Sequence, residues 1–315
     1  MDKEAKYNSE DSAVKQVDKK PDWLKVSFNR KETQEVIELM KDLQLNTVCK
    51  EANCPNLGEC YRSRTATFMI LGSNCTRNCR FCNVTCSIPD EVDPQEPAHL
   101  AEAAKKLNLK HVVVTSVTRD DLPDGGASQF VKVIHALREA LPKATVEVLI
   151  PDFQGDEAAL RAVLEAGPDV LNHNVETVAD LYKRVRPQAI YKRSLELLQR
   201  AKNFALEHKA KHPDLPRMLV KSGAMLGLGE TDEQLRELFR DLQAYGCDIL
   251  TLGQYLRPSR EHLPVERYVS PDEFEEYRQM ALAEGLAFVT STPLVRSSYR
   301  AEEALATVRA REAAL

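Results

Sequence analysis

The feature that most constrains the fold is an alternation of short apolar runs with amphipathic stretches, beginning near residue 65. The apolar runs are nearly continuous, as strands of a parallel sheet tend to be. They are TATFMILG, HVVVTSV, TVEVLIP, VLNHNVE, MLVKSGAML and DILTLGQYL. The stretches between them place apolar residues at helical spacing: EPAHLAEAAKKLN, ASQFVKVIHALREAL, DEAALRAVLEAG, RSLELLQRAKNFALEHK and TDEQLRELFRDLQAYG. This alternation predicts an α/β protein built from βαβ units around a parallel sheet.

The number of repeats indicates the kind of sheet. Six repeats in about 190 residues suit a partial (β/α)6 TIM-like barrel better than a complete eight-unit one. AFVTSTPLV, near residue 290, is a candidate for one more strand. Thr231 has the sequence context of a helix N-cap, and Gly167 and Gly246 stand where helix C-caps are expected.

The two ends of the chain do not follow the βα pattern, which predicts extensions on either side of the barrel. We expect a polar tail over 1–22, an N-terminal extension over 23–64, the barrel over 65–292 and a C-terminal extension over 293–315. The N-terminal extension holds one helix candidate, TQEVIELMKDL, and three closely spaced cysteines. The C-terminal extension is expected to end in a helix.

Cys75, Cys79 and Cys82 follow the first predicted strand with the spacing C-x3-C-x2-C. The carboxyl ends of barrel strands are where such folds build their sites. A structural zinc site is the plainer alternative, but such sites pair C-x2-C units and supply four ligands. Three thiolates on an iron–sulfur cluster would leave one iron open to another ligand. The spacing therefore favours an iron–sulfur cluster.

The first triplet in the chain, Cys49, Cys54 and Cys60, is spaced C-x4-C-x5-C in a stretch rich in turn formers. The alternative is three buried structural cysteines, although free cysteines seldom cluster so tightly. We expect a second cluster here, with a fourth ligand from elsewhere in the chain. Spacing gives Cys86 and Cys247 no role, and Cys247 is expected to be a small buried hydrophobe.

Bulk composition excludes several classes of protein. The net charge is −5, whereas nucleic-acid and anionic-membrane proteins normally carry a basic excess. No apolar run approaches the roughly 20 residues that cross a bilayer. The first 20 residues have neither the apolar core of a signal peptide nor the acid-poor character of a mitochondrial presequence. We expect a cytoplasmic protein with no nucleic-acid or membrane partner.

The second triplet in the chain, Cys75, Cys79 and Cys82, resembles the signature of the radical S-adenosylmethionine superfamily, in which three cysteines follow the first barrel strand. Phe81 matches the aromatic residue that lies by the adenine in that family. GAMLGLGE matches the pattern G-x-I-x-G-x-x-E through Gly223, Met225, Gly227 and Glu230. The resemblance implies that the open iron binds S-adenosylmethionine, whose cleavage releases a 5′-deoxyadenosyl radical.

Further motifs resemble those of the lipoyl synthase family. They run collinearly from about residue 21 to residue 300: VCKEANCPNLGECY, CTRNCRFC, RDDLPDGG, HNVET, GLGET, QYLRPS and VRSSY. The resemblance implies that a serine of the R-S-S-Y motif is the fourth ligand of the auxiliary cluster. By position this is Ser298, and Ser297 is the less favoured choice.

The family resemblance implies a sulfurtransferase that inserts two sulfur atoms, at carbons 6 and 8, into an octanoyl chain on a lysine of a lipoyl carrier domain. Its cofactors would be S-adenosylmethionine and two 4Fe-4S clusters, the auxiliary one consumed as sulfur donor. The implied carriers are the glycine cleavage H protein and acyltransferase subunits of 2-oxoacid dehydrogenases. A ferredoxin or flavodoxin would donate electrons, and an iron–sulfur carrier protein would rebuild the cluster.

Polar residues at strand ends are candidates for contacts with S-adenosylmethionine. Asp121, or Arg119, follows the second strand and Asn174 and Glu176 end the fourth; Gly227 and Arg257 follow the fifth and sixth. His173 is expected to be a satisfied strand-end histidine. The basic run KRVRPQAIYKR is either a solvated face, which we favour, or a docking site for the carrier.

Two other classes of function compete with this interpretation. One is a different radical S-adenosylmethionine enzyme with an auxiliary cluster, such as a methylthiotransferase or another sulfur inserter. The N-terminal position of the auxiliary triplet and the R-S-S-Y serine argue against it. The other is an electron carrier or a zinc-stabilised binding module, which would need no six-unit βα core.

Overall fold

A computed structural model describes residues 20–25, 33–52, 54–62, 67–299 and 301–313. Its main sheet has eight strands in the order β1-β2-β5-β6-β7-β8-β9-β10. They span Asn46–Thr47, Thr67–Ile70, His111–Ser116, Thr145–Leu149, Val170–Asn172, Leu219–Leu226, Ile249–Gln254 and Phe288–Ser291. All neighbours from β2 to β10 are parallel, whereas β1 pairs with β2 antiparallel. The six predicted strands and the seventh candidate are confirmed.

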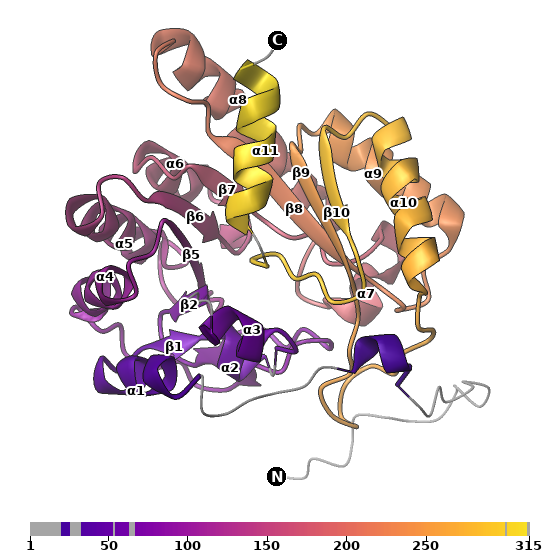
Figure 1. The fold of residues 1–315 in the computed structure, drawn as a ribbon, viewed down its shortest axis with the longest axis horizontal. Coiled ribbons are helices and arrows are strands. Elements are labelled where there is room, and N and C mark those ends of the chain that lie inside the picture. The colour runs from indigo at the N-terminus through magenta and orange to yellow at the C-terminus, as the bar shows by residue number, and fades with distance from the viewer. Residues whose placement is uncertain (1–19, 26–32, 53, 63–66, 300, 314–315) are drawn as a thin grey trace.

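Helices connect these strands and cover one face of the sheet (Figure 1). The predicted ones are α4 (Glu96–Lys106), α5 (Ala127–Ala140), α6 (Glu157–Glu165), α8 (Tyr191–Lys211) and α9 (Asp232–Ala244). Thr231 closes a capping box with Gln234, and both predicted C-cap glycines have positive φ. Short elements lie in the connections: β3 (Asn74–Cys75), β4 (Thr85–Cys86), η3 (Phe153–Gly155), η4 (Ala179–Leu181) and α7 (Tyr182–Val185).

The helix α10 (Pro271–Ala283), between β9 and β10, was not among the predicted elements. Only Phe274, Tyr277 and Ala281 of its residues are buried, so its apolar stripe is short. The clearer signal was its start, where Ser270 and Glu273 form a capping box and Pro271 occupies the first turn. Together with β10 this helix extends the barrel by one βα unit.

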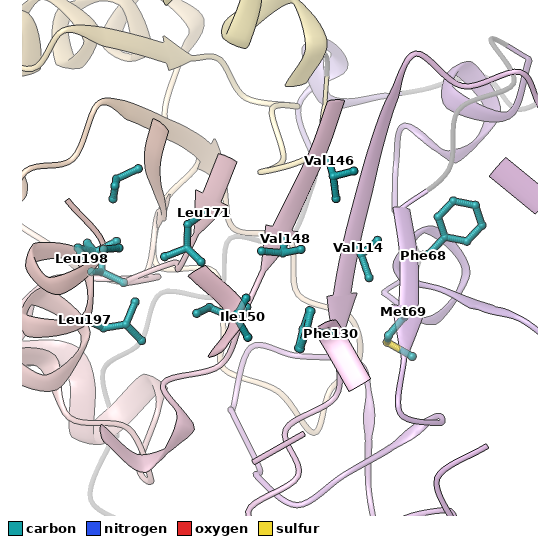
Figure 2. Close-up of a cluster of buried hydrophobic side chains, with 14 of the residues drawn as sticks. Phe68, Met69, Val114, Phe130, Val146, Val148, Ile150, Leu171, Leu197 and Leu198 are labelled. Atoms are coloured by element: carbon teal, nitrogen blue, oxygen red, sulfur yellow. The ribbon is translucent and has the colours of Figure 1, made fainter. Parts of the chain in front are cut away.

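The main core lies between the sheet and its helices. Figure 2 shows Val146 and Val148 of β6 among the side chains of this core, with Phe130 of α5 close by. Since successive side chains of a strand point to opposite faces, Glu147 points to the face away from the helices. This second face is more polar than the apolar runs suggest, because it carries Glu147, Lys221 and their hydrogen-bond partners.

The amino-terminal segment forms a small helical group beside β1 and β2 (Figure 1). It consists of α1 (Gln34–Asp42), which confirms the predicted helix, with α2 (Val48–Glu51) and α3 (Leu57–Arg62). A short turn of 3-10 helix, η1 (Asp22–Leu24), precedes them. Val36, Cys49 and Tyr61 join the main core. The predicted boundary between extension and barrel falls in residues 63–66, outside the described residues, and stays a prediction, as do the other domain limits.

The carboxyl-terminal helix α11 (Ala301–Ala313) packs against the amino ends of three strands, as Figure 1 shows in yellow. Its Leu305 and Val308 contact Val170, Leu219 and Ile249, the first residues of β7, β8 and β9. The predicted terminal helix is thus confirmed. Because α11 covers this end of the barrel, the open end for a site is the one where the strands finish. Within the described residues, no helix is long and apolar enough to span a bilayer.

Candidate functional site

The cysteine loop begins where the first barrel strand ends. Cys75 lies in β3, which pairs with β4 in a small separate sheet, and Cys79 and Cys82 follow in the loop between the two. The backbone amides of Arg77 and Thr118 donate to the Cys75 Sγ at 3.4 and 3.3 Å. Amide hydrogens directed at sulfur stabilise the charged thiolate, the form that binds metal.

Arg77 anchors the cysteine loop to two neighbouring strand ends. It donates two hydrogen bonds to Asp120, at 2.6 and 2.8 Å, and one to Asp152, at 2.6 Å. Burial alone would raise the pKa of Asp152, but the hydrogen bond and charge of Arg77 outweigh it and lower the pKa to about 2. Asp152 is therefore ionised, and a buried ion network fixes the loop.

Replacing Arg77 by methionine should destabilise the protein by about 3 kcal/mol, because it leaves a buried carboxylate without its main partner. Arg77→Lys keeps the charge but loses the two-pronged geometry, so it should cost less. Denaturant unfolding of the metal-free proteins measures both values. Equal stability of wild-type and Arg77→Met proteins would contradict the anchoring role.

The other side of the cysteine loop rests on the segment after β9. The Leu263 amide donates to the Arg80 carbonyl at 3.2 Å, and the His262 Nε2 lies 2.9 Å from the Cys82 carbonyl oxygen. Phe81 packs against an apolar cluster built from Val185, Leu228, Tyr255, Leu263 and Val265. Phe81 thus has the apolar surroundings expected of a residue that lies by a planar base, and that contact remains a prediction.

Asn174 and Glu176, both predicted contacts, lie beside the cysteine loop. The Asn174 side-chain amide donates to the Glu176 carboxylate at 3.1 Å. Glu176 has a φ of 68°, a left-handed conformation that non-glycine residues seldom adopt and that often marks functional sites. Burial raises the pKa of Glu176, although the charge of Arg186 opposes this. Arg186 also lies near Cys79 and donates to the Asn174 carbonyl at 2.9 Å.

The remaining predicted contacts already have partners in the protein. Asp121 is bound by Arg119 at 2.9 Å, and its side chain is 38% exposed. Gly227 has a φ of +96°, and a Cβ there would lie 2.4 Å from the Arg267 carbonyl oxygen. The Arg257 guanidinium donates to the carbonyls of His262 and Arg260 at 2.9 and 2.5 Å, so it organises its own loop. Their contacts with S-adenosylmethionine remain predictions.

The first triplet is held by two short helices. Cys49 lies in α2 and Cys60 in α3, and the amide of Cys54, between them, donates to the Cys49 carbonyl at 3.1 Å. Burial raises the pKa of Cys60 to about 12, and the nearby Cys49 and Cys54 add to this shift. The thiols of Cys49 and Cys54 thus lie close enough to Cys60 to affect its ionisation, and the joint role of the three as cluster ligands stays a prediction.

The R-S-S-Y segment lies against this triplet. The Asn56 side chain donates to the Leu294 carbonyl at 2.7 Å, and the Tyr299 hydroxyl donates to Glu59 at 2.9 Å. These contacts bracket Ser298 in sequence. The Ser297 hydroxyl is hydrogen-bonded to Asn174 at 2.7 and 3.0 Å, towards the barrel. Ser297 is thus engaged by the barrel, and the assignment of Ser298 as the ligand stays a prediction.

The donor chemistry of both triplets fits an iron–sulfur cluster, in which each thiolate binds a different iron. Among the described residues, no group of three or more His, Cys, Asp or Glu side chains is arranged to hold a single metal ion. All six thiols are uncrosslinked, and Cys49 is buried while the other five are partly buried. The donor set thus fits two clusters.

The other residues considered from sequence have structural roles. Cys247 is buried and its thiol donates to the Ile249 carbonyl at 3.1 Å, as expected. Cys86 is exposed. In the basic run, Arg186 points into the site and Arg193 binds Asp152 at 3.3 Å, so these two are unavailable for docking a carrier. Sequence reasoning missed Arg77 and the inward position of Arg186, because spacing alone does not distinguish a buried arginine from a solvated one.

His173 is satisfied on both ring nitrogens, as predicted: Nδ1 lies 2.9 Å from the Ile150 carbonyl oxygen and Nε2 lies 3.0 Å from the Ser194 hydroxyl. Burial and the charge of Arg186 lower the pKa of His173 to about 4.

This lowered pKa of His173 makes the stability of the protein depend on pH. In the unfolded chain the His173 side chain binds a proton near pH 6.5, whereas in the folded chain it stays neutral until about pH 4. The free energy of unfolding therefore falls as the pH drops from about 6.5 towards 4. Between pH 7 and 5, the metal-free wild type should lose about 2 kcal/mol more unfolding free energy than His173→Gln. An identical loss in both proteins would contradict this.

Comparison with known proteins bears on this geometry. The family model of the Radical SAM superfamily matches residues 69–242. A lipoyl synthase of Caldanaerobacter subterraneus subsp. tengcongensis is 53% identical over 291 residues, covering 92% of this chain and 99% of that protein. A lipoyl synthase of Caldicellulosiruptor saccharolyticus is 54% identical over 286 residues, covering 90% and 97%.

Solved structures bear on the fold alone. A structure of Streptococcus suis SuiB bound to S-adenosylmethionine superposes with a TM-score of 0.56 at 13% identity, covering 84% of this chain and 62% of that chain. A structure of HydG, a maturase of the FeFe hydrogenase, gives a TM-score of 0.51 at 15% identity, covering 83% and 68%. Both likenesses agree with the partial barrel.

Proposed function

The chain belongs to the lipoyl synthases of the radical S-adenosylmethionine superfamily, and from this membership we propose that its two cysteine triplets hold two clusters with separate tasks. Lipoyl synthases are sulfur-inserting enzymes that use a 4Fe-4S cluster and S-adenosylmethionine. The assignment of tasks to particular residues, and the second cluster itself, are the proposal.

Cys75, Cys79 and Cys82 would hold the cluster that binds S-adenosylmethionine. Together these groups supply a radical that removes hydrogen from unactivated carbon, which no tuned acid or base achieves. The protein positions the reactants and excludes water: Arg77 fixes the loop, and Phe81 offers an apolar face. Asn174 and Glu176 offer hydrogen-bonding groups near the loop, suited to the ribose or the methionyl part of S-adenosylmethionine.

Cys49, Cys54, Cys60 and Ser298 would hold the auxiliary cluster, which serves as the source of sulfur. A serine oxygen suits cluster iron less well than a thiolate does. Ser298 would therefore be the ligand best able to leave when the cluster gives up a sulfide.

Replacing Ser298 by cysteine should bind the cluster iron more strongly and slow turnover. Full turnover of a Ser298→Cys protein that keeps both clusters would contradict this role.

The substrate is an octanoyl chain on a lysine of a carrier domain, and the enzyme inserts sulfur at carbons 6 and 8. We propose that the carriers are the glycine cleavage H protein and the acyltransferase subunits of 2-oxoacid dehydrogenases. A ferredoxin or flavodoxin would supply electrons, and an iron–sulfur carrier protein would restore the consumed cluster. Arg184 of the basic run is paired with Glu266, which leaves the exposed Lys183 and Lys192 as the remaining candidates for contact with a carrier.

One observation carries the proposal: segments more than 230 residues apart meet at the first triplet, where Asn56 binds the Leu294 carbonyl and Tyr299 binds Glu59. This is the arrangement that a serine ligand from the far end of the chain requires.

The proposed function is tested by anaerobic incubation of reconstituted protein with an octanoyl-lysyl peptide, S-adenosylmethionine and dithionite. The peptide should gain two sulfur atoms, and two molecules of 5′-deoxyadenosine should form per product. A gain of a methylthio group would instead support a methylthiotransferase.

A further inference from the structure

The R-S-S-Y segment lies directly on the backbone of two barrel strands. A Cβ on Gly253 of β9 would lie 2.2 Å from the Val295 carbonyl oxygen. A Cβ on Gly223 of β8 would lie 2.9 Å from the Asn174 Oδ1 and 3.0 Å from the Ser297 Oγ. Since real side chains avoid such distances, glycine at these two positions lets residues 295–297 lie close to the inner face of the sheet.

Beneath this segment, Lys221 of β8 is buried in an ion pair. Its Nζ lies 2.9 and 3.3 Å from the two carboxylate oxygens of Glu147, and both side chains are 1% exposed. Glu147 also accepts a hydrogen bond from Asn172 at 3.2 Å and lies 3.4 Å from the His111 Nε2. The pair and its partners thus come from four neighbouring strands, β5, β6, β7 and β8, which fixes the position of the pair relative to the sheet.

The second partner of Lys221 is the segment of residues 295–297 itself. The Nζ donates to the Ser297 carbonyl at 2.5 Å, and the Ser297 hydroxyl is held by Asn174. Both polar groups of Ser297 that face the barrel are therefore bound. A buried ion pair contributes little to stability on its own, and apolar residues of similar volume often replace one without loss. Lys221 also donates to the backbone carbonyl of Ser297, next to the candidate ligand Ser298, and this contact indicates a role in function.

We propose that Lys221 is a positioning residue for Ser298: through the Ser297 carbonyl it holds the peptide from which the serine hydroxyl reaches the auxiliary cluster. This inference rests on the proposed function, in which Ser298 is the fourth ligand. With the backbone held at Ser297, Ser298 can leave the iron by moving its own side chain and can return to the same place. Without Lys221, the segment is tethered less firmly and the ligand dissociates more readily.

The test measures how fast a chelator removes iron from the auxiliary cluster, under anaerobic conditions and by visible absorbance. A Cys75→Ala, Cys79→Ala, Cys82→Ala background leaves only that cluster in the full-length chain. Lys221→Met in this background should raise the rate roughly tenfold, because a charge-assisted hydrogen bond that holds the ligand is lost. In the same background with Ser298→Ala, Lys221→Met should change the rate by less than about twofold, since it acts through the serine.

A matched control is Lys202→Met, which removes a part-buried contact of another lysine, with Asp248 at 2.6 Å. Arg217 still binds Asp248 at 2.9 Å, and the rate of iron loss should stay at the wild-type value. If Lys221→Met fails to fold because Glu147 is left unpaired, a Glu147→Gln, Lys221→Met double variant removes both charges. It should show the same roughly tenfold acceleration, because the Ser297 carbonyl has again lost its donor.

Three results separate the possible failures. Equal acceleration with and without Ser298 would mean that the pair is merely structural, which overturns the inference. A folded double variant with the rate of its parent would also overturn it. If the background protein binds no iron at the first triplet, the proposed function itself fails.

Discussion

Cys79→Ala is expected to abolish formation of 5′-deoxyadenosine and of any sulfur-containing product, while about half of the bound iron remains. Cys79 lies at the centre of the cysteine loop, near Arg186, and two thiolates cannot hold a cluster with one open iron. The first triplet lies on separate helices, so its iron should be retained. Chromatographic assay of 5′-deoxyadenosine and colorimetric iron determination measure the two effects.

Cys86→Ala is the matched control for this prediction, since Cys86 is exposed and lies on β4, paired in register with Cys75. It should keep full iron content and full activity. Retention of S-adenosylmethionine cleavage by the Cys79→Ala protein would contradict the assignment of the second triplet.

Cys54→Ala is expected to abolish sulfur insertion while S-adenosylmethionine is still cleaved. Cys54 lies between the helices that carry Cys49 and Cys60. Burial raises the pKa of the Cys54 thiol, and the charge of the nearby Arg296 opposes this shift. Losing this ligand should empty the auxiliary site. The peptide should then gain no sulfur, although 5′-deoxyadenosine accumulates.

Cys247→Ala serves as the control, because Cys247 is buried in the main core and its thiol is hydrogen-bonded to the Ile249 carbonyl. It should lose some stability and no sulfur insertion. A Cys54→Ala protein that still makes the two-sulfur product would show that the first triplet is not the sulfur source.

Much of the barrel could be predicted from sequence, because the features that define it are local. An apolar run such as HVVVTSV indicates a buried parallel strand, and a capping box such as the one at Thr231 indicates the start of a helix. The seventh βα unit was less evident, since α10 buries few apolar side chains. The two triplets could also be found, because metal ligands repeat at short spacings.

The polar interior could not be predicted in the same way. Lys221 stands in an apolar run, and only the pairing of β8 with distant strands brings it to Glu147, 74 residues away. The sequence context of Arg186 predicts a basic surface run, yet its guanidinium donates to the Asn174 carbonyl at the end of a strand. Such side chains gain their roles from tertiary contacts, and neither composition nor spacing records those contacts.

The same limit applies to Ser298, for which only the family resemblance predicts a role as a ligand. A serine carries no metal-binding signal by itself, and its distance in sequence from Cys49 excludes any argument from spacing. The contacts of Asn56 and Tyr299 across the two ends of the chain make the pairing physically reasonable.

The central claim is that the cluster on the first triplet supplies the inserted sulfur. The most direct test is to reconstitute the protein with ³⁴S-labelled sulfide, remove free sulfide, and allow one turnover on an octanoyl-lysyl peptide. Mass spectrometry of the product should show two ³⁴S atoms. A product that contains only sulfur of natural isotopic abundance would contradict the claim.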